Sequence, residues 1–203
     1  MSKPKETASA KQPAFSLDPQ YILRITGVLL AICLVTALLL GIVNQITAPR
    51  IDAIQKAKKE AAMSLVLPAD EYVLWEGNLP AHVTALYLAN SGGEGIGWVA
   101  ETAASGSQGT IEMMVGVGTD GKVTGVSVVK HSETPNIGTK VVADQSVLDR
   151  FTGMSHENGE ITVNSGSNRF DGVSGATFSS KGVADGVNTA LAAAYEAASG
   201  LVE

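Results

Sequence analysis

The sequence is poor in the side chains that carry metal, disulfide and thiol chemistry. Its 203 residues include one cysteine, Cys33, and three histidines. A single cysteine excludes a disulfide framework and an all-protein thiolate cluster within this chain. His82, His131 and His156 are far apart, and none has a ligand partner at metal-binding spacing. We therefore expect no metal site.

Positive charge and aromatic residues are also scarce. The formal net charge is -6 and aromatic residues make up 5% of the chain. The basic residues form no stripe and do not alternate with aromatics, which argues against a nucleic-acid partner. The stretch 172–176, Gly-Val-Ser-Gly-Ala, nearly matches the Gly-x-Ser-x-Gly elbow of hydrolases. No histidine follows Ser174, however, so the triad order of that hydrolase fold is missing.

One long apolar run is present near the N-terminus. Residues 25–43 are 19 residues without a charge, dominated by Leu, Ile, Val and Ala. At 1.5 Å per residue this run spans a hydrocarbon core of about 30 Å. We predict a single transmembrane helix at 21–46, with Tyr21 and Arg24 available at one interface. The alternative, a cleaved signal peptide, would have a shorter apolar region and a small-x-small cleavage site after it.

The segments on either side of the span have different compositions. Residues 1–20 are rich in Lys, Ser, Ala and Pro, which predicts a flexible tail. Residues 47–68 alternate apolar and charged residues at helical spacing, with Pro49 near the start and Pro68 just past the end. We predict a connecting helix there, with a solvated spacer as the alternative. Its expected domain-facing side consists of Ile51, Ile54, Ala57, Ala61 and Leu65.

The remaining chain, 69–203, has the pattern of one globular domain. Apolar runs at 111–116 and 122–130 flank Thr119-Asp120-Gly121, which predicts a β-hairpin. The other expected elements are a short helix or turn at 144–151, a strand at 159–163 and a loop at 164–170. The predicted fold class is α+β, a mostly antiparallel twisted sheet with flanking helices that follows the single transmembrane helix.

A turn rich in glycine and hydroxyl groups precedes the last apolar segment. Residues 171–180 read Asp-Gly-Val-Ser-Gly-Ala-Thr-Phe-Ser-Ser. Gly172 and Gly175 allow positive φ and close backbone approach. The residues that follow recur at helical spacing, namely Val183, Val187, Leu191 and Ala194. The turn is therefore expected at a helix N-terminus, where free N–H groups and the helix dipole favour a phosphate. An ordinary helix cap is the alternative.

A second polar segment follows the predicted hairpin. Residues 131–140 read His-Ser-Glu-Thr-Pro-Asn-Ile-Gly-Thr-Lys. Pro135 and Gly138 fix a loop, and the side chains between them give it more hydrogen-bonding groups than a turn needs. A plain surface loop remains the alternative interpretation.

Together, these two segments resemble a known family. Ser174-Gly175-Ala176-Thr177, preceded by Asp171 and followed by Ser180, resembles the covalent flavinylation motif of FMN-binding domains. These domains occur in the G subunit of Rnf complexes and in the C subunit of sodium-pumping NADH:quinone oxidoreductases. The loop 131–140 resembles the family's His-x-Glu-Thr-Pro-Gly-Leu-Gly segment, with Asn136 and Ile137 in place of Gly-Leu.

The resemblance implies a cofactor and the residues that hold it. FMN would be esterified through its phosphate to Thr177 by a dedicated flavin transferase that reads the motif, in which Asp171 matters. Hydroxyls and backbone N–H groups of the turn would hold the phosphate, and the 133–138 loop would line the ring system. Trp98 is expected either beside the ring or in the core. The implied site residues are Thr177, Ser174, Gly175, Ala176, Ser180, Asp171, Glu133, Thr134 and Gly138.

The resemblance also implies a function and a location. The chain would be an electron-carrying subunit, without a complete active site of its own, in an ion-translocating ferredoxin:NAD oxidoreductase. Its N-terminus would be cytoplasmic and its flavin domain on the outer face of the inner (plasma) membrane. This orientation comes from the resemblance alone, because positive charges flank both ends of the span and the positive-inside rule does not distinguish them. Implied partners are the other subunits, the flavin transferase and the lipid bilayer. The alternatives are the C subunit of the sodium-pumping enzyme, disfavoured because 44–203 leaves little room for its insertions, and a non-redox extracytoplasmic scaffold.

Overall fold

A computed structural model describes residues 19–200, in two compact units that divide between Ile51 and Asp52. Helix α1 (Pro19–Val66) makes up the first unit and continues into the second. Within the described residues it is the one helix whose length and composition suit a membrane crossing, and its apolar window is fully exposed. The predicted tail lies outside the described residues, apart from its last two positions.

The predicted span and the predicted connecting helix are parts of one helix. Pro49 lies inside α1 rather than at the start of a new helix. Proline fixes φ near the helical value and removes only one N–H, so a helix continues through it where the lost bond is tolerated. The structure shows no helix boundary near residue 47, and its second compact unit begins at Asp52, within the segment predicted as the connecting helix.

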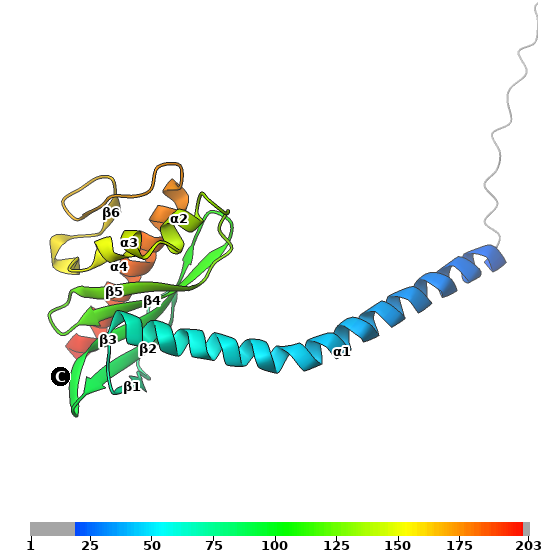
Figure 1. The fold of residues 1–203 in the computed structure, drawn as a ribbon, viewed down its shortest axis with the longest axis horizontal. Helices are drawn as coiled ribbons and strands as arrows, with labels where there is room; N and C mark the ends of the chain where they lie inside the picture. The colour runs from blue at the N-terminus through cyan, green and yellow to red at the C-terminus, as the bar shows by residue number, and fades with distance from the viewer. Residues whose placement is uncertain (1–18, 201–203) are drawn as a thin grey trace, which may run out of the picture. The chain divides into compact units, whose positions relative to one another are not determined.

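The second unit is built on a five-stranded antiparallel sheet in which each strand pairs with the next along the chain (Figure 1). Its strands are β1 (Glu71–Leu74), β2 (Val83–Ser91), β3 (Glu94–Ser105), β4 (Thr110–Gly118) and β5 (Val123–Lys130). The predicted hairpin is confirmed as β4 and β5. Gly118 N–H donates to the Lys122 carbonyl at 2.9 Å, and Gly121 takes φ +71° in the turn.

One face of the sheet is covered by α4 (Thr177–Gly200). The expected apolar side of this helix, represented by Val183, Val187 and Leu191, is buried against the strands. The helix lies close to β3 because Gly182 has no side chain. A Cβ at Gly182 would lie 2.4 Å from the carbonyl oxygen of Ser105.

The other face of the sheet receives the last turns of α1. Ala62, Met63 and Val66 pack against Val99 and Met114 in a second apolar cluster. The backbone of Val66 approaches two strand glycines, Gly116 and Gly125, which are register partners in β4 and β5. The Thr124 hydroxyl donates to the Val66 carbonyl at 2.6 Å, which ends the helix on the sheet.

The side of α1 that packs on the sheet is not the side that the sequence pattern predicted. Ile54 and Leu65, on the predicted side, are 57% and 62% exposed. Only the final turns of α1 contact the sheet. There Gly116 and Gly125 leave room for the helix backbone at Val66, and the small side chains of Ala62 and Val66 pack on the strands. Helical periodicity identified an apolar stripe but could not identify the one that meets these glycines.

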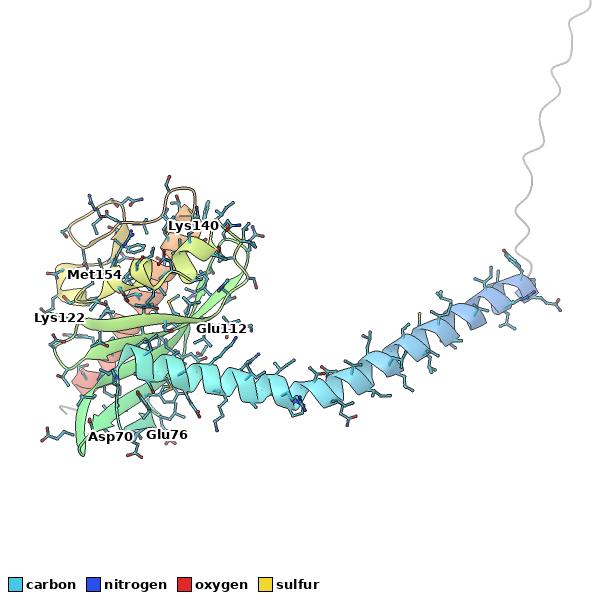
Figure 2. The ribbon with its side chains drawn as sticks, viewed as in Figure 1. Asp70, Glu76, Glu112, Lys122, Lys140 and Met154 are labelled. Carbon is cyan, nitrogen blue, oxygen red and sulfur yellow. The ribbon has the colours of Figure 1, made fainter. Side chains whose placement is uncertain are left out.

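The short elements between β5 and α4 agree in part with expectation. They are α2 (Thr139–Val142), α3 (Gln145–Leu148), η1 (Asp149–Phe151), η2 (His156–Asn158), β6 (Thr162–Val163) and β7 (Arg169–Phe170). The helix at 144–151 is confirmed as α3 and η1. The turn that carries Lys122 and the start of α2, marked by Lys140, lie at separate places on the domain (Figure 2).

The strand expected at 159–163 is shorter than predicted. Only Thr162–Val163 is strand, and it pairs in parallel with β7, inside the segment expected to be a loop. The amide side chain of Asn188 in α4 replaces a strand partner for the buried Ile161. It accepts from the Ile161 N–H and donates to the Ile161 carbonyl, both at 2.9 Å.

A partly buried ion pair joins the end of α1 to the sheet. Lys59 donates to Glu101 of β3, whose side chain is 10% exposed, while that of Lys59 is 38% exposed. The hydrogen bond to Glu101 raises the pKa of Lys59 above its ordinary value of 10.5, against a smaller opposing effect of burial. Burial, and then the charge of Glu101, raises the pKa of Tyr87 above 10.0.

We expect Lys59→Met to destabilise the domain by about 1 kcal/mol, since a nearly buried carboxylate loses its partner while water screens the half-exposed site. Because the folded pKa of Lys59 is raised, its contribution is complete below pH 10.5 and is lost as pH rises through the folded value. Denaturant unfolding at pH 7 and pH 11 should therefore show a smaller difference between variant and parent at pH 11. Deprotonation of Tyr87 also lowers the stability of both proteins as the pH rises above 10.0, because the pKa of Tyr87 is raised in the folded state. Lys58→Met, the exposed neighbour, is the control, and an equal loss in both variants would contradict the ion-pair assignment.

Candidate functional site

The turn that leads into α4 is shaped by two glycines in different ways. Ala176 N–H donates to the Val173 carbonyl at 3.0 Å, and Gly175 takes φ +81° as the third residue of this β-turn. Type II turns need positive φ at that position, so glycine is favoured there. Gly172 is required for space, because a Cβ there would lie 2.7 Å from Val163 Cγ1.

Polar contacts hold the start of this turn in place. Arg169 Nε lies 2.9 Å from Asp171 Oδ1, and Arg150 donates to the Asp171 carbonyl at 2.8 Å. The Asn164 side chain accepts from the Gly172 N–H at 3.0 Å. Asp171 is itself exposed, so its carboxylate is accessible at the surface beside the turn.

Thr177 is the first residue of α4 and its side chain is exposed. The N–H groups of Thr177, Phe178 and Ser179 belong to the first turn, which has no earlier helical carbonyl to bond. No acidic residue lies in that turn. An accessible hydroxyl beside free N–H groups at the positive end of a helix suits a phosphate ester.

The loop after β5 contains a non-glycine residue in the left-handed region. Asn136 takes φ +62°, so asparagine occupies the left-handed position where the family commonly has glycine. Its N–H donates to the Thr139 hydroxyl at 2.8 Å. The Thr134 carbonyl accepts from the N–H groups of Ile137 and Thr139 at 3.2 and 3.3 Å. The departure from Gly-Leu therefore leaves the loop closed.

A buried carboxylate ties this loop to the turn of α4. Glu133 is 5% exposed, and its Oε1 accepts from the N–H groups of Ser107 and Gln108 at 2.8 and 3.1 Å. Its Oε2 accepts from the hydroxyl of Ser179, which is itself buried. Glu133 thus joins the β3–β4 turn, the 131–138 loop and the first turn of α4. We call this group the Glu133 latch.

Glycine at 138 is part of the same arrangement. A Cβ at Gly138 would lie 2.3 Å from Glu133 Oε2 and 2.8 Å from Ser179 Oγ. The residue has ordinary helical angles, φ -64°, so glycine is needed there for space rather than for conformation. The loop and the helix can approach each other only because this side chain is absent.

The two predicted segments meet at a shallow hollow of about 50 Å³. This volume has room for a group of a few heavy atoms, such as a phosphate, but not for a flavin ring. Exposed apolar side chains, Ile137 at 50% and Phe178 at 74%, border it. Its lining residues are Ser107, Glu133, Thr134, Ile137, Gly138, Gly175, Ala176, Thr177, Phe178 and Ser179.

Three predicted site residues lie outside this hollow. Ser174 and Asp171 are exposed on the turn. Ser180 is completely buried, and its hydroxyl accepts from the Val173 N–H at 3.2 Å, so it holds the turn rather than facing a ligand. Sequence reasoning noted the hydroxyl of Ser179 without giving it a partner, and nothing in the pattern pointed to Ser107 or Gln108.

Trp98 does not border the hollow at Thr177. It is 5% exposed and makes an edge contact with Trp75 at 5.4 Å between ring centroids. Of the two alternatives left open, the structure supports the core position. Among residues 19–200, no group of three or more His, Cys, Asp or Glu side chains is placed to hold a metal ion.

The chain contains one Gly-x-Gly-x-x-Gly sequence, Gly116–Gly121. In the dinucleotide-binding fingerprint such glycines connect a strand to a helix. Here they form the end of β4 and the turn into β5. No helix N-terminus receives a phosphate at this turn, so the spacing does not indicate a nucleotide site.

Comparison with known proteins adds to this geometry. Residues 106–192 match the family described as FMN-binding domain, and residues 18–66 match the RnfG N-terminal region. The G subunit of the Na(+)-translocating ferredoxin:NAD(+) oxidoreductase complex of Acetobacterium woodii is 30% identical over 193 residues, covering 86% of this chain and 92% of that protein. The G subunit of the proton-translocating complex of Clostridium ljungdahlii is 31% identical over 180 residues, with coverage of 86% and 92%.

Among solved structures, the NqrC protein of Shewanella oneidensis matches with a TM-score of 0.45 and 20% identity, over 64% of this chain and 67% of that one. The family is shown by the two matched regions together with the relatives named as G subunits over most of their length. The chain therefore belongs to the family of G subunits of ion-translocating oxidoreductase (Rnf) complexes.

Proposed function

We propose that this protein is the electron-transfer subunit of a membrane-bound ion-translocating ferredoxin:NAD oxidoreductase and carries FMN covalently on Thr177. The relatives named as G subunits and the matched FMN-binding domain support the electron-transfer role. The observation that carries the attachment site is the exposed hydroxyl of Thr177 at the N-terminus of α4, beside the 131–138 loop.

The residues of the turn have distinct roles in this proposal. Thr177 Oγ1 forms the ester bond to the phosphate, and the first-turn N–H groups together with Ser174 hold the phosphate oxygens. Gly175 gives the turn its shape, and Ala176 anchors it through the bond to Val173. Ser180 positions the turn from beneath. Asp171 is exposed where a flavin transferase can read it.

The 131–138 loop supplies the other wall. Thr134 and Gly138 line the hollow beside Thr177, and Glu133 fixes the loop against α4. The three donors around Glu133 offset its negative charge, which would otherwise disfavour a phosphate nearby. FMN, once bound, supplies the redox chemistry, while these residues supply position and electrostatics.

The bilayer and the other subunits complete the proposed setting. The exposed apolar part of α1 suits a single crossing of the inner (plasma) membrane. We place the N-terminus in the cytoplasm and the flavin domain on the outer face. A covalent bond has a physical purpose on that side, because a cofactor that dissociated there would be lost by dilution.

We expect Thr177→Ala to abolish covalent FMN completely, because no hydroxyl remains to form the ester. The full chain should be co-expressed with a flavin transferase and analysed by intact and peptide mass spectrometry. The parent peptide should gain one FMN less one water. Thr189→Ala is the matched control, since that hydroxyl lies in the same helix and donates to the Asp185 carbonyl.

Retention of the adduct in Thr177→Ala would overturn the attachment site. An unmodified parent peptide, under conditions where another substrate of the transferase is modified, would overturn covalent tethering.

The same peptide also reports the orientation of the chain in the membrane. Protease added outside intact cells should release it, and its release only from inverted vesicles would overturn the outer-face location.

A further inference from the structure

A second and larger hollow lies at the other end of α4. Its volume is about 320 Å³, at the lower end of the range typical of ligand pockets. Leu191 and Tyr195 line it and follow Thr177 by 14 and 18 residues, so they lie about 21 and 27 Å further along the helix at 1.5 Å per residue. None of the residues at the Thr177 hollow lines it.

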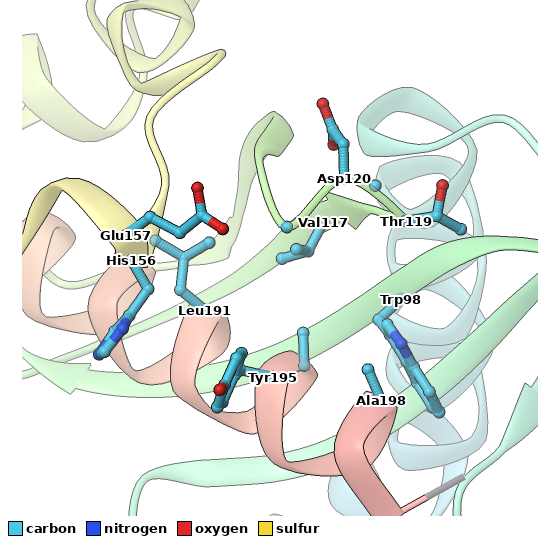
Figure 3. A pocket seen from close by; sticks show the side chains of 12 residues that line it. Trp98, Val117, Thr119, Asp120, His156, Glu157, Leu191, Tyr195 and Ala198 are labelled. Atoms are coloured by element: carbon cyan, nitrogen blue, oxygen red, sulfur yellow. The ribbon is translucent and has the colours of Figure 1, made fainter. Parts of the chain in front are cut away.

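The walls of this hollow are apolar and aromatic on one side. Trp98 from β3 and Tyr195 from α4 lie along one edge, and the carboxylates of Asp120 and Glu157 lie along the opposite edge (Figure 3). Tyr195 is 68% exposed, so its ring is accessible at the edge of the hollow. The ring of His156 stacks beside Tyr195 at 6.2 Å between centroids.

The electrostatics of the hollow favour a cation. Asp120 and Glu157 are its two charged lining residues, and the lining includes no lysine or arginine. Lys122, outside the lining, lies 3.5 Å from Asp120, but both side chains are more than half exposed and their interaction is weak. The carbonyl end of a helix carries partial negative charge, and the last turn of α4 has no basic residue to offset it.

These observations also argue against other occupants. A flavin or nucleotide phosphate would face two carboxylates and the negative end of a helix dipole. The volume suits one long side chain rather than a whole dinucleotide. A guanidinium can pair with a carboxylate while its planar face stacks on the exposed ring of Tyr195, and arginine combines both contacts better than lysine.

We propose that this hollow is a docking site for an arginine side chain of a neighbouring subunit in the complex. The inference rests on the proposed role of the chain within a complex, but it does not depend on FMN at Thr177. The aromatic edge contacts the stem and the guanidinium face, and the carboxylates take the charge. The end of α4 that is remote from the flavin turn thereby serves assembly.

The first test uses the two tryptophans as reporters. Trp98 lines the hollow, and Trp75 contacts Trp98. The chain has no other tryptophan. N-acetyl-arginine amide, added to the full chain in detergent, should change the fluorescence saturably, while the neutral isostere N-acetyl-citrulline amide should not. Tyr195→Ala should weaken binding about two- to fivefold, in line with an exposed cation–π contact.

Charge neutralisation should have a comparable effect. Asp120→Asn with Glu157→Gln should weaken binding severalfold, whereas Glu60→Gln with Glu94→Gln, at exposed positions elsewhere, should leave it unchanged. The proposal would be overturned if the citrulline derivative bound as tightly as the arginine derivative, or if Asp120→Asn with Glu157→Gln did not weaken binding. Covalent FMN is measured by mass on the same samples, so a failure of flavinylation is seen separately.

The second test asks whether another protein of the complex supplies the arginine. Tyr195→p-benzoylphenylalanine in the assembled complex should crosslink to an arginine-containing segment of a neighbouring subunit. The same replacement at Leu74, 54% exposed on β1, is the control position. A site that binds the arginine derivative but gives no crosslink to a neighbour would be a small-molecule site, and that outcome would overturn the docking proposal.

Discussion

Glu133→Ala should destabilise the flavin domain by about 2–4 kcal/mol, because it removes the acceptor for two backbone N–H groups and one hydroxyl. Ser179 and the carboxylate are buried, so the hydroxyl loses its partner where water does not replace it. Ser107 and Gln108 lie on an exposed turn, and water can partly satisfy their N–H groups. The loss of unfolding free energy should therefore exceed that of a single hydrogen bond, but it should be less than the cost of leaving three buried donors without an acceptor.

The Glu133 latch also predicts an order among variants. Glu133→Gln keeps one carbonyl oxygen for Ser107 and Gln108 and should lose less, about 1–2 kcal/mol. Ser179→Ala removes one donor, and its effect should not add to that of Glu133→Gln, because the two side chains share a bond. Denaturant unfolding followed by tryptophan fluorescence gives these values. Glu94→Ala, at the exposed first residue of β3, is the control.

Flavinylation separates the positioning role from plain stability. If Glu133 holds the loop beside Thr177, Glu133→Gln should lower the rate of FMN incorporation under conditions where the domain remains folded. Additive stability losses for Glu133→Gln and Ser179→Ala, with unchanged incorporation in both, would contradict the latch.

Gly182→Ala should destabilise the domain by about 2 kcal/mol or more, the cost of forcing extra volume into a packed interface. The added Cβ would lie 2.4 Å from the Ser105 carbonyl oxygen and 3.3 Å from Gly106 Cα, and backbone cannot rotate away as a side chain can. In an unconstrained helix the same change would be favourable by about 1 kcal/mol. The sign of the effect therefore tests how closely α4 approaches β3.

Gly186→Ala, one turn further along α4, is the matched comparison. Its Cβ would meet the flexible end of Met113, with Cε at 2.8 Å and Sδ at 3.0 Å, which can move. We expect this variant to lose clearly less stability than Gly182→Ala in the same unfolding measurement. A stabilising effect of Gly182→Ala would show that the helix lies further from the strand than the structure places it.

Elements with a strong local pattern were predictable from the sequence. The apolar period of α4, the Asp-Gly turn between β4 and β5 and the short helix at 144–151 each depend on residues close in the chain. The meeting of the 131–138 loop with the turn before α4 was suggested by family resemblance rather than by spacing, since Glu133 and Ser179 are 46 residues apart. The side of α1 that packs was missed because it depends on Gly116 and Gly125, residues distant in sequence.

The second hollow left almost no signal in the sequence. Its walls come from β3, the β4–β5 turn, η2 and α4, which the fold brings together from separate segments. Tyr195 fits the helical pattern of α4 without revealing that it is exposed. Close packing against a glycine, and hollows formed by several separate elements, can be recognised only in the three-dimensional structure.

The continuation of α1 from an exposed apolar segment into a buried one also limits where the flavin domain can be separated from that segment. Ala62, Met63 and Val66 belong to a cluster that also contains Ala89, Val99 and Met114, and these three residues have no exposed surface. A cut at the boundary suggested by sequence, residue 69, would leave this face of the sheet bare in water. Shedding of an intact domain would have to occur before the last turns of the helix, at or ahead of Asp52. The exposed apolar segment and part of the second apolar cluster thus lie in a single uninterrupted helix.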